Sequence, residues 1–234
     1  LSTLIIQIII MKTILKKFFH TYLVPEKINQ FWIIYFAVGV AGLSFPLTSN
    51  FFRELIGFSL LISLVLMMVF HQPWSKSFIG SSAIIIIGGF GLEAWGVNTG
   101  HIFGAYSYGD ALGPKIMGTP LLIGLNWWML IYIVFQITEE IKIPAGAKLV
   151  LGALLMTGYD VVMEPIATST GMWDWLGHHV PFQNYLAWFV ISFFFLLVLR
   201  LFRVRYKNPV AMLLFVAQTG FFVLLNLIEE LKSL

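Results

Sequence analysis

Residues 77–97 read SFIGSSAIIIIGGFGLEAWGV, and this stretch decides which kind of fold the chain adopts. It is long enough for a helix to cross the hydrocarbon core of a bilayer, and its single charged residue is Glu93. The rest of the chain has the same character: 59% of the 234 residues are hydrophobic and 11% are charged, against about 25% charged in soluble domains. This composition excludes a soluble enzyme and a disordered chain, and it predicts a multi-pass membrane protein.

Apolar runs between polar or Pro/Gly breaks predict seven helical spans. Their approximate ranges are 29–49, 52–70, 77–97, 119–138, 146–165, 183–202 and 209–229. The sequence shows no repeat and no long linker, so we expect an all-α polytopic transmembrane bundle that forms a single domain over residues 29–234. Residues 1–28 are expected to be an N-terminal extension and a basic segment. Residues 1–10 are too short to cross a bilayer, and Met11 is the expected natural start.

The lysines and arginines are distributed unevenly between the two ends of the predicted bundle. Eleven of the 14 fall on one side of the predicted bundle, and Arg53, Lys115 and Lys232 fall on the other. Cytoplasmic loops of membrane proteins carry an excess of positive charge, so we expect the N-terminus in the cytoplasm and the C-terminus outside. The net charge of +3 then indicates contact with anionic membrane lipids and no binding of nucleic acid.

Three acidic residues lie at the opposite, non-basic end of the predicted spans. Glu93 is near the end of 77–97, while Asp160 and Glu164 are near the end of 146–165. Acids inside a span are costly, and a single one is most simply a link between helices. Three of them with almost no lysine or arginine nearby favour a catalytic site. Asp160 and Glu164 are four residues apart on one helix face, so we expect at least one to hold a proton. Pro165 is expected to end this helix.

Two aromatic, glycine-rich loops, residues 97–110 and 171–185, flank the three acids. Aromatic residues are common at membrane interfaces, and Trp74 and Trp188 fit such a belt. The loops are denser in aromatic residues than a belt requires, and aromatic faces near buried acids can stabilise a positive charge formed on a hydrocarbon. The candidate pocket residues in and near these loops are His101, Tyr106, Tyr108, Asn126, Trp173, Trp175 and Asn184.

No metal ion or other cofactor is expected. The chain has no cysteine, which excludes thiol chemistry and thiolate metal sites. His101, His178 and His179 do not form the spaced histidine clusters of membrane di-iron enzymes, and no His-Glu-x-x-His motif is present. Hydrogen-bonding or proton-shuttle roles therefore suit these histidines better. Residues 209–229 contain no lysine that could hold retinal.

Two blocks of motifs resemble a known family. The first reads Glu93-x-x-Gly96-x-x-Thr99-Gly100-x-x-Phe103-Gly104-x-Tyr106-x-Tyr108, followed by Leu112-Gly113, Thr119-Pro120 and Trp127. The second reads Asp160-x-x-x-Glu164-Pro165-x-Ala167, Gly171-x-Trp173-x-Trp175 and Pro181-x-x-Asn184-Tyr185-x-x-Trp188. Their order over about residues 80–190 resembles the membrane carotenoid-biosynthesis proteins, a family with carotenoid 1',2'-hydratases and the bisanhydrobacterioruberin hydratase type among its members.

The resemblance implies a cofactor-independent hydro-lyase that adds water to the terminal C=C of an acyclic carotenoid end group. Such hydration needs a strong proton donor, a tertiary carbocation and a captured water molecule. We expect Asp160 to donate the proton, and Glu164 and Glu93 to order or activate water. The implied substrate is a lipid-dissolved carotenoid in a bacterial or archaeal inner membrane. Other carotenoid-biosynthesis enzymes are candidate partners.

Two other functions stay open from the sequence. The same protonation followed by ring closure would make the protein a carotenoid end-group cyclase of the lycopene type. The buried acids could also serve as the relay of a proton-coupled transporter, although the sequence shows no inverted repeat. Product mass separates the first alternative from hydration, and vesicle uptake tests the second.

Overall fold

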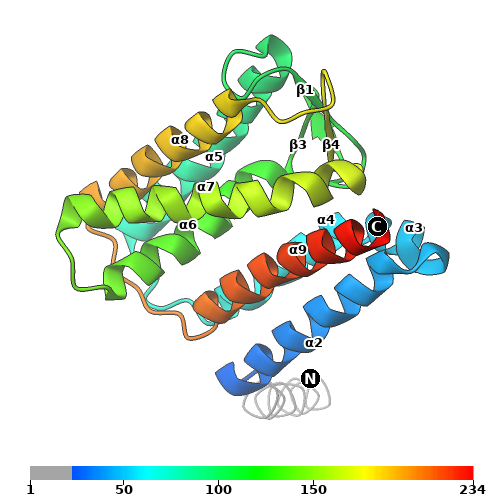
Figure 1. Ribbon diagram of the computed structural model, residues 1–234. Coiled ribbons are helices and arrows are strands. Elements are labelled where there is room, and N and C mark those ends of the chain that lie inside the picture. Colours follow the sequence, from blue (N-terminus) through cyan, green and yellow to red (C-terminus); the bar gives the residue numbers. More distant parts are fainter. Residues whose placement is uncertain (1–22, 234) are drawn as a thin grey trace, which may run out of the picture.

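Figure 1 shows the computed structural model, which describes residues 23–233 as a helical bundle with short strands in the loops at one end. The predicted extension over residues 1–10, Met11 and the lysines Lys12, Lys16 and Lys17 lie outside this range. The strand-containing loops form what we call the loop cap, residues 100–121 and 170–181. The loop cap matters because it covers the ends of the helices that carry the three acids.

Eight α-helices make up most of the described chain. They are α2 (Pro25–Ser44), α3 (Pro46–Glu54), α4 (Ile56–Val69), α5 (Lys76–Thr99), α6 (Leu122–Glu140), α7 (Ala145–Ser169), α8 (Phe182–Leu201) and α9 (Ala211–Ser233). Within residues 23–233, five helices, α5 to α9, are long and apolar enough to cross a membrane, or six spans if α3 and α4 count as one. The all-α membrane fold is therefore confirmed. The seven predicted spans correspond to α2, the α3–α4 pair and α5 to α9, but α2 is not among the helices of residues 23–233 that are long and apolar enough to cross a membrane.

The first two predicted spans have different boundaries in the structure. The predicted range 29–49 runs too far, because α2 ends at Ser44 and Pro46 begins α3. A proline disfavours the helical conformation in the residue before it, which explains the break. The predicted range 52–70 crosses a second break at Leu55, where the axes of α3 and α4 differ by 57°. The second span is therefore a bent pair of helices.

Helix α7 continues past Pro165, so the prediction that it ends just after Glu164 was wrong. The helix runs for another turn to Ser169. A proline removes one backbone donor from the helix ladder. The following turn keeps local bonds, among them one from the Thr168 hydroxyl to the Glu164 carbonyl at 2.9 Å. One missing bond is thus not enough to end a long helix that is packed on both sides.

Helix α6 lies at the centre of the bundle. It is the most buried of the candidate spans, and residues 127–136 are buried without interruption, as expected for a helix that is apolar all round. Its neighbours α5, α7, α8 and α9 pack around it, while α2 packs along α9 on the outer flank (Figure 1). The C-terminal ends of α5 and α7 and the N-terminal ends of α6 and α8 therefore meet under the loop cap.

The loop cap holds two short antiparallel strand pairs, which the sequence did not predict. Strand β1 (Tyr106–Tyr108) pairs with β4 (Trp173–Trp175), and β2 (Lys115–Ile116) pairs with β3 (Thr119–Pro120). The β1–β4 pair joins the two aromatic loops, which are far apart in the sequence. It therefore brings the two predicted aromatic groups to one place.

Candidate active site

The β1–β4 strand pair carries four aromatic residues on its inner face. Its register places Tyr106 opposite Trp175 and Tyr108 opposite Trp173. Alternate residues of a strand point to the same face, so these four side chains point toward the helices. The residues between them, Ser107 and Asp174, are exposed on the outer face. The sequence alternation of aromatic and polar residues in both strands is what directs the four rings inward.

Close backbone contact holds this strand pair to the turn that follows α7. The backbone N–H of Gly109 donates to the Met172 carbonyl at 2.9 Å. A Cβ atom on Gly109 would lie 2.0 Å from the Gly171 carbonyl oxygen, which no side chain can tolerate. Gly171 itself has a φ of +76°, a conformation that favours glycine. The two loops can approach this closely because residue 109 is glycine, and the positive φ of residue 171 is one that glycine adopts readily.

Glu93 accepts three hydrogen bonds near the end of α5. The hydroxyls of Tyr106 and Tyr108 both donate to its Oε2, the latter at 2.7 Å. The indole N–H of Trp127, on α6, donates to Oε1 at 2.7 Å. Trp127 reaches Glu93 because α5 approaches α6 closely: a Cβ on Gly89 would lie 3.0 Å from the Cβ of Trp127. Gly89, one of the glycines that precede Glu93 on α5, permits this close helix approach.

Glu164 also accepts three hydrogen bonds, again with two from the strand pair. The indole N–H groups of Trp173 and Trp175 donate to its Oε2 at 3.0 and 2.8 Å. The amide of Asn184, at the start of α8, donates to Oε1 at 3.3 Å. The side chains of strand β1 therefore donate hydrogen bonds to Glu93, and those of strand β4 donate to Glu164. The strand pair holds the two carboxyl groups on either side of one small space.

Asp160 lies beside Glu164 and is fully buried. The same Asn184 amide that donates to Glu164 donates to Asp160 Oδ2 at 2.6 Å. The second oxygen, Oδ1, has no hydrogen-bond partner within the part of the chain that the structure describes. Asp160 and Glu164 are therefore linked through one shared donor.

No cation neutralises the three acids among residues 23–233. The ion pairs there involve Asp110, Glu139 and Asp174. The lysine of the loop cap, Lys115, donates to the Tyr108 carbonyl at 2.7 Å and to Asp110 at 2.8 Å. Its hydrogen bond and charge lower the pKa of Asp110. The acids are stabilised by neutral N–H and O–H donors instead.

The two tyrosines of β1 remain protonated donors. Burial, reinforced by the nearby charge of Glu93, raises the pKa of both Tyr106 and Tyr108 well above the ordinary tyrosine value. A phenol with a raised pKa keeps its proton at any physiological pH. Their hydroxyls therefore act as fixed hydrogen-bond donors to Glu93 and do not supply protons themselves.

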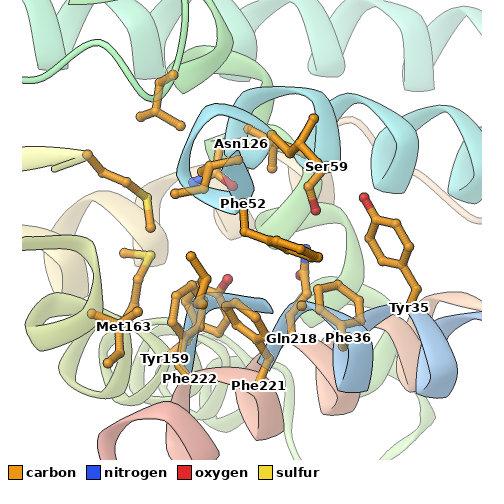
Figure 2. Close-up of a pocket in the computed structure, with 18 of the residues that line it drawn as sticks. Tyr35, Phe36, Phe52, Ser59, Asn126, Tyr159, Met163, Gln218, Phe221 and Phe222 are labelled. Atoms are coloured by element: carbon orange, nitrogen blue, oxygen red, sulfur yellow. The ribbon is translucent and has the colours of Figure 1, made fainter. Parts of the chain in front are cut away.

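Two cavities meet at this site. The smaller one has a volume of about 20 Å³, which is room for one water molecule. It is lined by Glu93, Phe103, Tyr106, Tyr108, Ile123, Asn126, Met163, Glu164, Trp173, Trp175, Asn184 and Trp188. The larger one has a volume of about 180 Å³ and lies among α2, α3, α4, α7 and α9, as Figure 2 shows. Ile123, Asn126, Met163 and Trp173 line both, so the cavities adjoin.

The structure brings eight of the ten sequence-predicted site residues to the small cavity. The two exceptions are Asp160, which lines neither cavity and lies behind Asn184 and Glu164, and His101. His101 is exposed, and its contacts are made by its backbone: its carbonyl accepts from Gln183, and its N–H donates to the Thr99 hydroxyl at 3.3 Å. It follows the left-handed Gly100 that ends α5, and this turn directs the chain outward.

Sequence reasoning missed two tryptophans of the small cavity. The prediction that Trp188 belongs to an interfacial belt was wrong, because it is buried and its ring lies 4.2 Å from that of Trp127. Trp127 stands out in the sequence only as part of a motif, although it is a direct donor to Glu93. The available signal was the polar Asn126 beside Trp127 within an otherwise apolar span.

The described residues contain no cluster of three or more His, Asp or Glu side chains placed to hold a metal ion. The oxygens of Glu93 and Glu164 accept hydrogen bonds from N–H and O–H donors. The donor set instead suits carboxyl groups that exchange protons or order water.

Comparison with known proteins identifies relatives of the chain. The family model described as "Carotenoid biosynthesis protein" matches residues 55–231. A bisanhydrobacterioruberin hydratase of Haloarcula japonica is 27% identical over 107 residues, which are 42% of this chain and 36% of that protein. The chain thus matches little more than a third of the length of this relative. No solved structure matches the chain.

Proposed function

This chain belongs to the carotenoid biosynthesis protein family, and we propose that it adds water to the terminal C=C of an acyclic carotenoid end group. One observation carries the proposal. A cavity with room for one water molecule is lined by two buried carboxyl groups and adjoins a larger, mostly apolar cavity. Water, acid and hydrocarbon can therefore meet at one place. The named activity of the Haloarcula relative supports the same reaction.

The proton is held by the Asp160–Glu164 pair. Two ionised carboxylates on one helix face, in an interior without a cation among the described residues, repel each other strongly, so the pair shares one proton. Asp160 has an oxygen without a partner in residues 23–233 that can carry it, whereas Glu164 is the member that lines the cavity. We therefore assign delivery of the proton to Glu164. Asp160, which the sequence favoured as the proton donor, does not line the cavity. It holds the shared proton and passes it to Glu164.

Glu93 receives the proton that the water molecule releases. Glu93 accepts hydrogen bonds from three neutral donors on its two oxygens, and it faces the same small cavity as Glu164. A carboxylate so placed can orient a water molecule and accept its proton. The two glutamates thus act from separate walls of the cavity.

The reaction balances without an external reagent. The proton of the pair adds to the less substituted alkene carbon, and the positive charge forms on the tertiary carbon. The oxygen of the water molecule then bonds to this carbon, and one water proton passes to Glu93. Return of that proton to the Asp160–Glu164 pair resets the site. The net change is the addition of one molecule of water to the substrate.

Aromatic rings around the small cavity favour the cationic intermediate. Tyr106 and Trp175 have ring centroids 5.0 Å apart, and Trp127 and Trp188 are 4.2 Å apart. A carbocation close to a ring face is stabilised by the negative charge density of that face. The rings also leave little room beside the acids for more than one water molecule.

The experiment is expression in a host that accumulates lycopene, with mass analysis of the extracted pigments. The unchanged chain is expected to produce pigment heavier by one water molecule per reacted end. Glu164→Gln is expected to lower the product by about 100-fold or more, the usual effect of removing a general acid. Glu229→Gln is the matched control, because Glu229 is exposed and accepts a hydrogen bond from Ser169 at 2.9 Å, away from both cavities.

Three outcomes would contradict the proposal. Full hydration by Glu164→Gln would remove the assigned acid. A pigment of unchanged mass with a new ring would indicate an end-group cyclase. Proton-dependent uptake into vesicles, with no change in pigment, would indicate a transporter. We propose the cell membrane of a bacterium or archaeon as the site of action, because the substrate dissolves only in lipid.

A further inference from the structure

We propose that the larger cavity binds the part of the polyene next to the reacting end and selects chains that carry a hydroxyl group there. The inference rests on the proposed function for the identity of the chain, an acyclic isoprenoid. It adds a second subsite, which we call the polar subsite: Tyr35, Ser59 and Gln218. None of these residues belongs to the acid site.

The larger cavity is placed to hold such a chain. It adjoins the small cavity through Asn126 and Met163, so a chain bound in it can place its reacting end beside the acids. Its lining includes Val38 on α2, whose side chain is 51% exposed on the outer surface of the bundle. The cavity therefore extends from the acid site to an exposed part of α2. The rest of a long polyene can remain in the bilayer.

The lining of this cavity contains polar side chains that have no partner among residues 23–233. Most of the wall that these residues form is apolar, and none of it is charged. Across the same range, no side-chain hydrogen bond is formed by the five polar lining residues, Tyr35, Ser59, Asn126, Tyr159 and Gln218. Gln218 is the most informative of them, because it is only 6% exposed and its Oε1 is buried with no partner in the described chain.

The polar subsite lies away from the acids. Figure 2 shows Gln218 among the aromatic rings of α2 and α9, with Tyr35 and Ser59 on the same side of the cavity and Asn126 on another. Gln218 is on α9, Tyr35 is on α2 and Ser59 is on α4. They are brought together by the packing of α2 along α9 and belong to no single motif.

A hydroxyl group is the ligand feature that satisfies this subsite. A buried amide without a partner is destabilising, and a plain hydrocarbon that filled the cavity would leave Gln218 unpaired. A hydroxyl group can accept from the amide N–H of Gln218 and donate to the hydroxyl oxygen of Tyr35 or Ser59. The uncharged lining disfavours a phosphate, carboxylate or ammonium group, which would need a counter-charge.

Short acyclic isoprenoid alcohols test the subsite and measure its distance from the acids. Geraniol, farnesol and geranylgeraniol share the reacting end group and carry a hydroxyl at increasing distance from it. Each is titrated into the purified protein in detergent, alongside the hydrocarbon that lacks its hydroxyl, with tryptophan fluorescence as the readout. At least one alcohol is expected to bind about two- to tenfold more tightly than its hydrocarbon, the range for one hydrogen bond.

The variants assign this preference to the polar subsite. Gln218→Leu is expected to abolish the preference, and Ser59→Ala is a second, smaller change that should reduce it if Gln218→Leu cannot be purified. Thr219→Val is the matched control, because Thr219 follows Gln218 on α9 and its hydroxyl donates within its own helix, to the Phe215 carbonyl at 2.8 Å. This control is expected to keep the preference.

Equal binding of every alcohol and its hydrocarbon by the unchanged protein would overturn the inference. A preference that survives both Gln218→Leu and Ser59→Ala would do the same, because the hydroxyl would then bind elsewhere. The measurement needs no turnover, so it is independent of the proposed function. A preference lost in the variants, in a protein that hydrates nothing, would leave the subsite standing and contradict hydration alone.

Discussion

Glu93 and Glu164 are each held by three neutral donors, and two of the three come from the same strand pair. Hydroxyl and indole groups hold a carboxyl group in place but, unlike a cation, they do not neutralise its charge. Asn184 adds the link between Glu164 and Asp160. Single donors at this site can therefore be removed while the fold is kept.

Tyr108→Phe removes one donor to Glu93 and keeps the ring. We expect hydration to slow by about tenfold or more, the usual effect of losing a hydrogen bond to a charged group. The rate is measured from hydrated pigment in isolated membranes that contain equal amounts of protein. Ser107→Ala is the matched control, because Ser107 is the neighbouring residue on the outer face of β1. An undiminished rate in Tyr108→Phe would show that Glu93 does not need this donor.

His71 is expected to make stability depend on pH. Its side chain is buried after the end of α4, with Nδ1 3.0 Å from the Tyr132 hydroxyl. Burial lowers the pKa of His71 below the ordinary histidine value of about 6.5, and a backbone hydrogen bond at Pro73 partly opposes this. The unfolded chain therefore takes up a proton first as the pH falls. The contribution of neutral His71 to stability is complete above about pH 6.5 and is progressively lost as the pH falls below that value.

Thermal unfolding in detergent measures this effect. The Tm is expected to fall as the pH is lowered from about 7.5 to about 5, and His71→Phe should flatten that slope. His178→Gln is the control, because His178 is an exposed histidine of the loop cap. The same slope in His71→Phe as in the unchanged protein would assign the pH dependence to other groups.

At the scale of the elements, the site depends on two close approaches that glycine permits. Gly89 lets α6 bring Trp127 against α5, and Gly109 lets β1 lie against the turn after α7. The first joins two helices of the bundle, and the second joins the two halves of the loop cap. The donors of Glu93 and Glu164 are in place only when both contacts form.

Gly109→Ala is expected to separate the halves of the loop cap. Its new Cβ would meet the Gly171 carbonyl oxygen at 2.0 Å, so the loops must move apart. We expect faster proteolysis within residues 100–121 and loss of hydration, while the helices remain folded by circular dichroism. Gly158→Ala is the matched control, since a Cβ there meets nothing within 4 Å. Proteolysis of Gly109→Ala at the rate of the unchanged protein would contradict this role.

The sequence predicts the long helices well because apolar length is a strong local signal. The range 77–97 lies within α5 at Lys76–Thr99, and 183–202 differs from α8 by one residue at each end. The cost of a buried charge also distinguishes Glu93, Asp160 and Glu164 in the sequence alone. These features can be read from short windows of sequence.

The partners of each acid could not be predicted in the same way. Pairing of Tyr108 with Trp173 depends on contact between distant loops, and neither three-residue strand has enough length to be recognised from its pattern. Likewise, the position of Asp160 behind Asn184 depends on how α8 packs on α7. Tertiary contacts decide these points, and local propensity carries little information about them.

At the scale of the whole molecule, the two ends of the bundle differ in charge. Glu139 bonds Lys148 and Arg200 at the end opposite the loop cap, which draws α6, α7 and α8 together there. The acid site lies at the end with few basic residues. Together with the positive-inside rule, this predicts that the loop cap faces away from the cytoplasm.

Single cysteines test this orientation cleanly, because the chain has none of its own. Ser107→Cys lies on the exposed face of the loop cap, and Arg203→Cys lies in the loop after α8. A membrane-impermeant maleimide is expected to label the first in intact cells and the second only after the cells are permeabilised. The reverse pattern would place the acid site on the cytoplasmic side.

We propose that Glu164 and Glu93 add one molecule of water to a carotenoid end group. The most direct test is to incubate the purified protein with lycopene in lipid vesicles prepared in water labelled with oxygen-18, and to measure the mass of the product. The product is expected to be heavier by one molecule of labelled water, with the label in a tertiary hydroxyl, and Glu164→Gln is expected to form none. A product of unchanged mass, or one whose oxygen does not carry the label, would contradict it.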